Sequence, residues 1–248
     1  MRVLVAGAAG AIGRRLIPRL VAAGHQVAAT TRTAAKVEQL RKLGAEPLVV
    51  DGLDAAAVTG AVAQARPDAI VHQMTALAGK PDLRRFDRWF ATTNELRTKG
   101  TDILLAAARD AGVARLVAQS YTGWTNPSTG GPVKTEEDRL EPHPPRMQRE
   151  SLAAIRHLEQ VVPAAPVEGI VLRYGNFYGP GASESLVELI RKRRWSGASA
   201  ASTTSPTTTR PPSTRGCRTW PRSWGRSRRC ACRPGSGGRW PVPSRSGG

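Results

Sequence analysis

Three glycines near the amino terminus have the spacing of a phosphate-binding turn. They stand at positions 7, 10 and 13, between a short apolar run and an amphipathic one. In such a turn the first glycine permits a tight exit from a strand, the second lets backbone approach a phosphate, and the third lets a helix lie close to a sheet. The helix N-terminus offers free N–H groups and a partial positive charge to an anion. The residues expected to line a dinucleotide pyrophosphate are Gly7, Ala9, Gly10, Ala11, Ile12 and Gly13.

The residues after the second apolar run indicate which dinucleotide would bind. A carboxylate at this point would bind the ribose 2′-hydroxyl of NAD, but the run Ala28-Ala29-Thr30-Thr31-Arg32 contains no acid. Arg32 stands where it could pair with a 2′-phosphate, and Lys36 follows one helical turn later. We therefore expect NADP, with NAD as the alternative. In a competing interpretation Arg32 is a solvated loop residue and the glycine turn is only a packing turn.

Strand and helix patterns alternate along the first 190 residues and would position these groups. Short apolar runs predict strands at 3–6, 25–30, 46–50, 69–74, 115–119 and 167–172. Apolar residues at helical spacing predict helices at 12–20, 34–43, 54–65, 83–111, 147–161 and 185–190. Six buried strands alternating with helices predict an α/β fold, a doubly wound parallel sheet of the Rossmann type. Its ligand crevice lies at the carboxyl ends of the strands.

The residues at those strand ends are further candidates for contact with the cofactor. Asp51 and Gly52 follow the third predicted strand, where the adenine would lie, and Gln73 and Met74 end the fourth. His72 precedes them, and we expect it to be a packed strand residue rather than a catalytic one. Within residues 1–190 the sequence therefore predicts one NAD(P)-binding domain.

These features resemble the extended short-chain dehydrogenase/reductase superfamily, the NAD-dependent epimerase/dehydratase group. Besides the glycines, the resemblance rests on Asp51, Val71-His72-Gln73, Asn94 with Gly100-Thr101, and the run from Leu172 to Gly181. It implies an NAD(P)-dependent oxidoreductase or an epimerase/dehydratase-like protein, acting on a carbonyl or hydroxyl of a sugar-like or small substrate. It allows a homodimer through the helices at 83–111 and 147–161. The further cofactor contacts that it implies are Asn94, Gln119, Tyr174, Gly175 and Asn176.

The sequence departs from this family at the reaction centre. The family carries a Tyr-x-x-x-Lys pair on the helix after the fifth strand, where the tyrosine exchanges a proton and the lysine lowers its pKa. Met147 and Ser151 fall at those positions here. Ser120 and Tyr121, at the end of the fifth strand, are the candidate catalytic hydroxyls, although they would equally suit cofactor contact or packing. The alternative function is a non-catalytic, NADP-binding, redox-sensing module.

The basic charge is confined to the end of the chain. The net charge is +18, but residues 1–190 hold 23 Lys/Arg and 19 Asp/Glu, whereas residues 191–248 hold 14 Lys/Arg and no acid. From Trp195 onward the apolar periodicity is lost, which predicts a disordered, low-complexity tail in place of a substrate lobe. Its three cysteines, Cys217, Cys230 and Cys232, lack the spacing of a metal site, and we expect no metal.

Three explanations of residues 191–248 stay open. Interleaved Arg and Trp would suit a nucleic-acid-binding tail, and the composition also suits a solvated linker. A reading frame shifted after about Arg194 is favoured over both, because residues 207–212, read one base earlier, permit Asp-Asp-Ala-Ala-Ala. No apolar run is long enough to span a membrane, so we expect a cytoplasmic protein whose partner is a small-molecule substrate.

Overall fold

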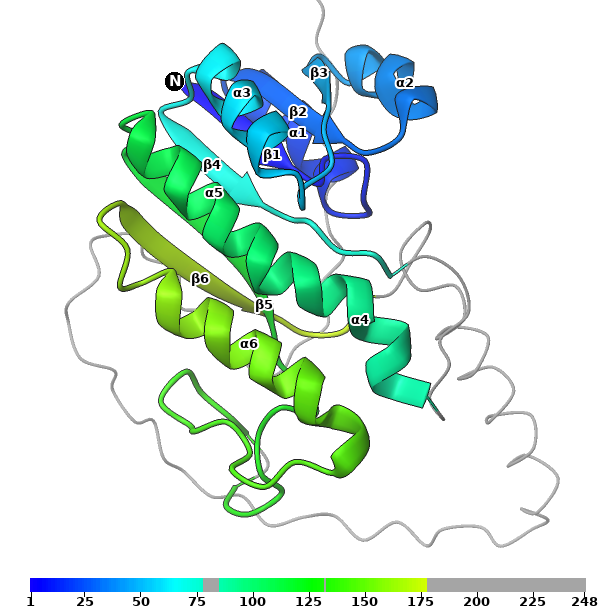
Figure 1. Ribbon diagram of the computed structural model, residues 1–248, viewed down its shortest axis with the longest axis vertical. Coiled ribbons are helices and arrows are strands. Elements are labelled where there is room, and N and C mark those ends of the chain that lie inside the picture. The colour runs from blue at the N-terminus through cyan, green and yellow to red at the C-terminus, as the bar shows by residue number, and fades with distance from the viewer. Residues whose placement is uncertain (78–84, 132, 178–248) are drawn as a thin grey trace, which may run out of the picture. The chain divides into compact units, whose positions relative to one another are not determined.

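The computed structural model describes residues 1–77, 85–131 and 133–177. Its strands form one sheet in the order β3-β2-β1-β4-β5-β6, and all five neighbouring pairs are parallel (Figure 1). The predicted doubly wound α/β sheet is therefore confirmed. The strands are β1 (Arg2–Ala6), β2 (Gln26–Thr31), β3 (Glu46–Val49), β4 (Ala69–His72), β5 (Arg115–Tyr121) and β6 (Glu168–Tyr174).

Two apolar clusters cover the two faces of this sheet, because successive strand residues point to opposite sides. The helices are α1 (Gly13–Ala22), η1 (Ala34–Lys36), α2 (Val37–Lys42), α3 (Ala55–Ala65), α4 (Phe86–Arg97), α5 (Lys99–Asp110), η3 (Arg146–Gln148) and α6 (Arg149–Val161). On one face Leu4, Ile70 and Leu116 pack with α3, α5 and α6. On the other face Val5 and Val27 pack against α1 and α2.

The helix predicted over 83–111 is wrong at one point, because the structure divides it into α4 and α5. Thr98 separates them with φ −96° and ψ −90°. Its Oγ1 donates to the carbonyl oxygens of Asn94 (2.9 Å) and Glu95 (3.3 Å), a back-bonding pattern that bends helices. The break leaves Arg97 as the last residue of α4 and Lys99 as the first of α5.

The fifth strand also runs two residues further than predicted. Ser120 and Tyr121 pair in register with Arg173 and Tyr174 of β6. They are therefore strand residues rather than loop residues, and their side chains point to opposite faces of the sheet. Only one of the two candidate hydroxyls can therefore reach the crevice.

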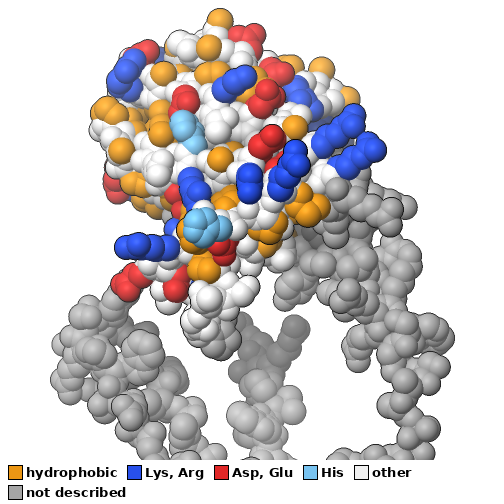
Figure 2. All heavy atoms as spheres, turned by 60° about the horizontal axis from the view of Figure 1, so that its bottom comes forward, with side chains coloured by type: hydrophobic (Ala, Val, Ile, Leu, Met, Phe, Trp, Pro, Cys, Tyr) orange, Lys and Arg blue, Asp and Glu red, His pale blue; other side chains and the backbone are white. Residues whose placement is uncertain are grey.

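The described surface carries both signs of charge. Figure 2 shows Lys and Arg side chains interspersed with Asp and Glu on one face, with hydrophobic side chains scattered between them. Exposed ion pairs such as Arg115–Glu168 (2.7 Å) and Lys99–Glu95 (3.7 Å) contribute to this mixture. A nucleic-acid-binding stripe would instead gather Lys and Arg.

Several expectations fall on other parts of the chain. The chain divides into two units, residues 1–201 and 202–248. The predicted helix at 185–190, the tail at 191–248 and its three cysteines lie outside the described residues. Among the helices of the described residues, none has the length and hydropathy required to cross a membrane.

Candidate active site

Gly7 and Gly13 shape the turn between β1 and α1, which we call the phosphate-binding turn (residues 7–13). Gly7 has φ +81°, and a Cβ there would lie 2.5 Å from the carbonyl oxygen of Gln73. A Cβ on Gly13 would lie 2.2 Å from the carbonyl oxygen of Ala8. Both positions therefore require glycine for the fold itself. The turn is held to β2 by the backbone N–H of Ala8, which donates to the carbonyl of Thr30 (3.0 Å).

Gly10 differs from its two partners because the fold leaves room for a side chain there. It is exposed, and an added Cβ would meet only the carbonyl oxygen of Gly7, at 3.4 Å. Its missing side chain keeps open the space above the turn. Within the described part of the chain, four backbone N–H groups around it donate to no acceptor. These belong to Ala9, Ala11, Ile12 and Gly13, and unpaired N–H groups opening a helix suit an anion.

The residues predicted to meet the adenosine half of the cofactor differ from one another in their exposure to solvent. Arg32 directly follows β2 and is exposed, and Lys36 is exposed in η1. Asp51 is also exposed, and its Oδ1 accepts from the N–H of Leu53 (3.1 Å). Gly52 and Met74 lie deeper, because a Cβ on Gly52 would lie 2.3 Å from the Met74 sulfur. The Met74 side chain belongs to the apolar core, so only backbone at these two positions is left for a ligand.

His72 is a packed strand residue, as the sequence predicted. It is 2 % exposed, and its Nδ1 accepts from the N–H of Met74 (3.2 Å). Its Nε2 lies 3.1 Å from Oγ1 of Thr101, so the neutral tautomer with a proton on Nε2 satisfies both contacts. Burial lowers the pKa of His72 to about 4. The imidazole therefore stays neutral and structural near pH 7.

Side chains from three neighbouring strand ends meet at the carboxyl edge of the sheet. Nε2 of Gln73, which follows β4, donates to the hydroxyl of Tyr174 at the end of β6 (3.4 Å). The hydroxyl of Tyr121, at the end of β5, donates to Oδ1 of Asn176 (2.8 Å). Gln119 is half-buried on the same face of β5 as Tyr121, and a Cβ added to Gly175 would have no atom within 4 Å. This edge is where a doubly wound sheet binds its ligand.

Three buried polar atoms near this edge lack hydrogen-bond partners in the described part of the chain. They are Oε1 of Gln73, Oδ1 of Asn94 and Nε of Arg97. Asn94 does use its Nδ2, which donates to Oγ of Ser151 (3.2 Å). A buried donor or acceptor without a partner costs about 1–3 kcal/mol, and native proteins have few of them. A ligand offering both donors and acceptors, such as a nicotinamide riboside, fits this set. We call Gln73, Asn94, Arg97, Tyr121 and Asn176 the reaction-end cluster.

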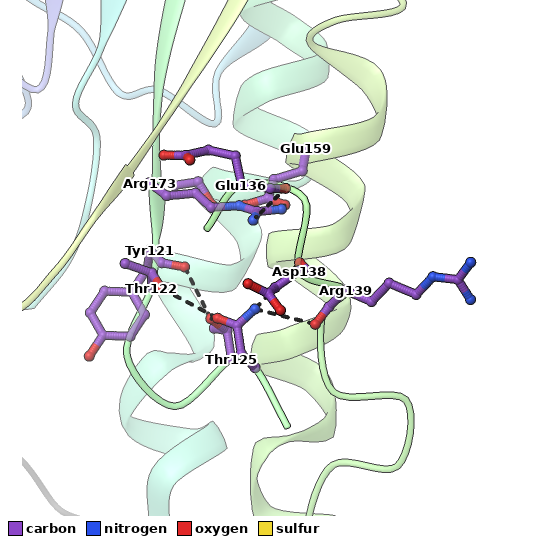
Figure 3. A network of polar contacts seen from close by, with 10 residues as sticks. Tyr121, Thr122, Thr125, Glu136, Asp138, Arg139, Glu159 and Arg173 are labelled. Atoms are coloured by element: carbon purple, nitrogen blue, oxygen red, sulfur yellow. Dashed lines mark hydrogen bonds and ion pairs between the residues drawn. The ribbon is translucent and has the colours of Figure 1, made fainter. Parts of the chain in front are cut away.

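The structure separates the two candidate catalytic hydroxyls. Ser120 is fully buried, and its hydroxyl donates to Oε1 of Glu159 (2.6 Å). Glu159 also accepts from Nε (3.0 Å) and Nη2 (2.8 Å) of Arg173. Figure 3 shows this ion pair between β6 and α6, with the Tyr121 ring on the other side of β5. Ser120 is thus engaged in a structural network, whereas Tyr121 belongs to the reaction-end cluster.

Helix α6 confirms that the family's Tyr-x-x-x-Lys pair is missing. The helix reads Arg-Glu-Ser-Leu-Ala-Ala-Ile-Arg-His-Leu-Glu-Gln-Val, without a tyrosine or a lysine at any position. Met147 is 42 % exposed in η3, before the helix begins. Ser151 is buried, and its hydroxyl donates to Oδ1 of Asp87 (2.6 Å). Neither residue can act as an acid of the family type.

Arg97 is the one member of the reaction-end cluster that sequence reasoning missed. It is 3 % exposed, although arginine is rarely buried without a partner. A signal was present, because Arg97 falls at helical spacing after Phe90 and Thr93 and before Thr101, on the inward face of its helix. A lone cation in such a stripe marks a buried charge.

A model of the NAD dependent epimerase/dehydratase family matches residues 3–201. The chain belongs to this family. The resemblance found in the sequence is thereby confirmed, and the cofactor class is a nicotinamide dinucleotide. One curated relative of this chain is a 3-diazoavenalumate denitrifying reductase of Streptomyces sp. The two sequences are 44% identical over 184 residues, which cover 73% of this chain and 58% of that protein.

Two further relatives place the chain within the family. A 2-alkyl-3-oxoalkanoate reductase of Stenotrophomonas maltophilia is 31% identical over 199 residues, or 78% of this chain and 56% of that protein. The crystal structure of Thermus thermophilus UDP-glucose 4-epimerase in complex with NAD is similar with a TM-score of 0.60 and 29% identity. The similar region covers 79% of this chain and 63% of the epimerase. The chain thus spans a little more than half the length of the curated relatives it matches.

Proposed function

We propose that this chain binds NADP(H) and is the cofactor-binding part of a reductase or dehydrogenase acting on a carbonyl or hydroxyl of a small substrate. The observation that carries the proposal is the phosphate-binding turn. Its four unpaired N–H groups surround an exposed glycine that the fold does not require, and an anion is the ligand that such an arrangement suits.

The residues for the rest of the cofactor follow from their place along the sheet edge. Arg32 and Lys36 would hold the 2′-phosphate, and Asp51 with the backbone at Gly52 would meet the adenosine. The unpaired oxygens of Gln73 and Asn94 would accept from the nicotinamide half. The remaining residues proposed at that half are Met74, Gln119, Tyr174, Gly175 and Asn176.

The preference for NADP is tested by comparing dissociation constants. Arg32→Ala should raise the dissociation constant of NADPH by about tenfold or more, because a charge-assisted pair to phosphate is lost. The dissociation constant of NADH should not change. Arg41→Ala is the matched control, since Arg41 is an exposed arginine that pairs with Glu38 on α2. Equal affinities of the wild-type protein for NADPH and NADH would reject the assignment.

The direction of the proposed reaction is reduction. The bound cofactor would supply hydride, while the protein supplies orientation and excludes water. Two relatives carry the names of reductases, which supports this direction. Loss of NADPH absorbance with a panel of 3-oxoalkanoates, aryl ketones and sugar ketones tests the proposal. Turnover of one class would identify the substrate.

A second candidate is a non-catalytic, redox-sensing module, and the observation that favours it is the absence of tyrosine and lysine from α6. The two candidates give different results in the same pair of assays. A sensor would bind NADPH and NADP⁺ with different affinities and would oxidise NADPH with no member of the panel. A reductase would turn over at least one of them.

We also propose a homodimer formed through the layer of α4, α5 and α6. Ala106 and Ala153 are exposed on α5 and α6, and small side chains let a second copy approach closely. Sedimentation equilibrium should give twice the chain mass for the wild type and the single mass for Ala153→Glu. A single mass for the wild type would reject the dimer.

A further inference from the structure

We propose that Tyr121 and Arg97 together replace the missing tyrosine–lysine pair, with Tyr121 as the proton donor and Arg97 as the cation that stabilises its phenolate. This inference rests on the proposed reductase function and adds the residues that would make it work.

Arg97 is a buried cation on the inward face of α4. It is 3 % exposed, its Nε has no partner, and no ion pair reaches its guanidinium within the described residues. An unpaired buried charge lowers stability unless something compensates for it. Charges held in this way occur at functional sites, where they act on neighbouring groups.

Arg97 lies beside the end of β4, because Thr101, whose Oγ1 is 3.1 Å from Nε2 of His72, also donates to the carbonyl oxygen of Leu96, the residue before Arg97 (3.5 Å). The Arg97 charge acts on His72, at the end of β4, and on Tyr121, at the end of β5, lowering the pKa of each. Helix α4 is also tied to Tyr121 through aromatic rings. The Tyr121 ring lies 6.0 Å from Trp124, which meets Phe86 of α4 edge to face at 5.1 Å. Burial lowers the pKa of Arg97 to about 10, so the guanidinium stays charged at neutral pH.

Tyr121 has the properties of an acid that is neutral at rest. Its hydroxyl is held by Oδ1 of Asn176 at 2.8 Å, and the side chain is half-buried. Burial raises the pKa of Tyr121, while Asn176 and the Arg97 charge oppose that rise. The phenol is therefore protonated before reaction, and the nearby cation favours the phenolate that forms when the proton leaves.

When bound, NADPH would supply hydride to the carbonyl carbon of the substrate and would leave as NADP⁺, while the C=O π electrons move to the oxygen. That oxygen would take the hydroxyl proton of Tyr121, so that the ketone becomes a secondary alcohol. The phenolate then regains a proton from water. Arg97 exchanges no proton and acts on the substrate only through Tyr121, which makes it a positioning residue.

The coupling can be measured without cofactor by titrating the tyrosines. The chain has three tyrosines, so the difference in ultraviolet absorbance between the wild type and Tyr121→Phe isolates the ionisation of Tyr121. Arg97→Met should raise its midpoint by about one pH unit or more, and Arg97→Lys should restore most of the shift. The other titratable groups on the two neighbouring strands are His72 of β4 and Glu168, Arg173 and Tyr174 of β6, and they are unchanged in both variants. An unaltered midpoint in Arg97→Met would overturn the proposal.

A matched control separates this local effect from the general charge of the protein. Lys99 lies two residues further along and carries the same charge, but its side chain is 72% exposed. Solvent screens such a charge, so Lys99→Gln should leave the Tyr121 midpoint unchanged. An equal shift in both variants would reject a specific role for Arg97.

Thermal unfolding distinguishes this role from a structural one. Met fills a similar volume without a buried charge, so Arg97→Met should melt at the same temperature or higher. A lower melting temperature, or failure to fold, would mean that Arg97 stabilises the structure and would count against the proposal.

The final measurement separates this inference from the function on which it rests. In the wild type, NADPH binding and turnover test the proposed function alone. In Tyr121→Phe, kcat should fall by about 100-fold or more with the dissociation constant of NADPH unchanged, since general acid catalysis contributes that much. Wild-type protein that fails to bind NADPH would reject the function, whereas full kcat in Tyr121→Phe would reject only the acid.

Discussion

The phosphate-binding turn and the reaction-end cluster meet a ligand in different ways. The turn offers backbone N–H groups, and its glycines matter for the side chains they lack. The cluster offers side-chain atoms from the ends of three strands and from α4. The turn keeps its family pattern at all three glycines, whereas the family's pair is missing from α6. A turn that binds its ligand through backbone N–H groups tolerates few residue types at its glycine positions. A role carried by a side chain can instead be taken over by a residue on another element that reaches the same point in the site.

The two regions also differ in how many of their polar atoms have hydrogen-bond partners within the described protein. The turn is fastened to β2 by the N–H of Ala8, which donates to the carbonyl of Thr30, and by the N–H of Gly7, which donates to Oγ1 of Thr30. Of its four unpaired N–H groups, three belong to partly exposed residues that water can reach, and the fourth belongs to the buried Gly13. The cluster buries three polar atoms that have no hydrogen-bond partner among the residues the structure describes. Such atoms lower stability, so their presence is informative about function. We expect some mutations in the turn to change the free energy of unfolding and others to change cofactor affinity alone. Mutations that remove the unpaired polar atoms of the cluster should raise stability while they reduce function.

The largest effect should come from Gly7→Ala, which tests whether the turn requires glycine for its fold. The added methyl would meet the Gln73 carbonyl at 2.5 Å in a left-handed conformation. These two penalties should lower the free energy of unfolding by about 4 kcal/mol in urea titrations. Gly24→Ala is the control, because Gly24 has the same φ of +81° with no atom within 4 Å. It should lose only about 1 kcal/mol. Equal losses would show that the close approach to Gln73 has no effect.

A smaller effect on binding, with little on folding, is expected for Gly10→Leu. The fold has room for a side chain at this position, but the side chain would occupy the space over the unpaired N–H groups. Dinucleotide affinity should fall by about 100-fold, equivalent to about 2.7 kcal/mol. The free energy of unfolding should change by less than about 0.5 kcal/mol, as for other surface substitutions. If the folded variant keeps its affinity for NADPH, the turn does not hold the pyrophosphate.

An effect of about 2 kcal/mol is expected in the pH dependence of stability, through the buried His72, which directly precedes Gln73 of the reaction-end cluster. Burial lowers the pKa of His72 from 6.5 to about 4, so the unfolded chain binds more protons between these values. Stability is therefore complete above about pH 6.5 and is lost as the pH falls toward 4. Between pH 7 and pH 5 the His72 contribution to this loss is about 2 kcal/mol. His72→Asn should remove that part of the loss, and His143→Asn, at an exposed histidine, should retain it. Identical pH dependence in the wild type and His72→Asn would contradict this.

The sequence predicted the sheet and the turn because both depend on local patterns. Apolar runs and glycine spacing can be read within a few residues, and each predicted strand was found with its ends shifted by no more than two residues. The break at Thr98 was missed because threonine is common in continuous helices, and the bend depends on where its hydroxyl donates.

The roles of Ser120, Tyr121 and Arg97 needed the tertiary structure. Placing the end of the fifth strand at Gln119 left the directions of Ser120 and Tyr121 open. Their pairing with β6 sends Ser120 toward Glu159 and Tyr121 toward the crevice. The helical spacing of Arg97 places it on the inward face of α4, but the strand ends beside it are distant in sequence, so its neighbours could be named only from the tertiary structure.

The smallest effect should come from Asp87, which links the two helices behind the reaction-end cluster. Its carboxylate accepts from the N–H groups of Glu150 (3.3 Å) and Ser151 (3.1 Å), so α4 caps the first turn of α6. Asp87→Ala should lower the free energy of unfolding by about 1 kcal/mol, the usual effect of losing a helix cap. Asp110→Ala removes an exposed carboxylate whose partner is its neighbour Arg109, and it should change stability by less than about 0.5 kcal/mol. Because Ser151 also holds Asn94, the loss of Asp87 should weaken NADPH binding as well. Unchanged affinity together with reduced stability would show that the cluster is positioned independently of the α4–α6 contact.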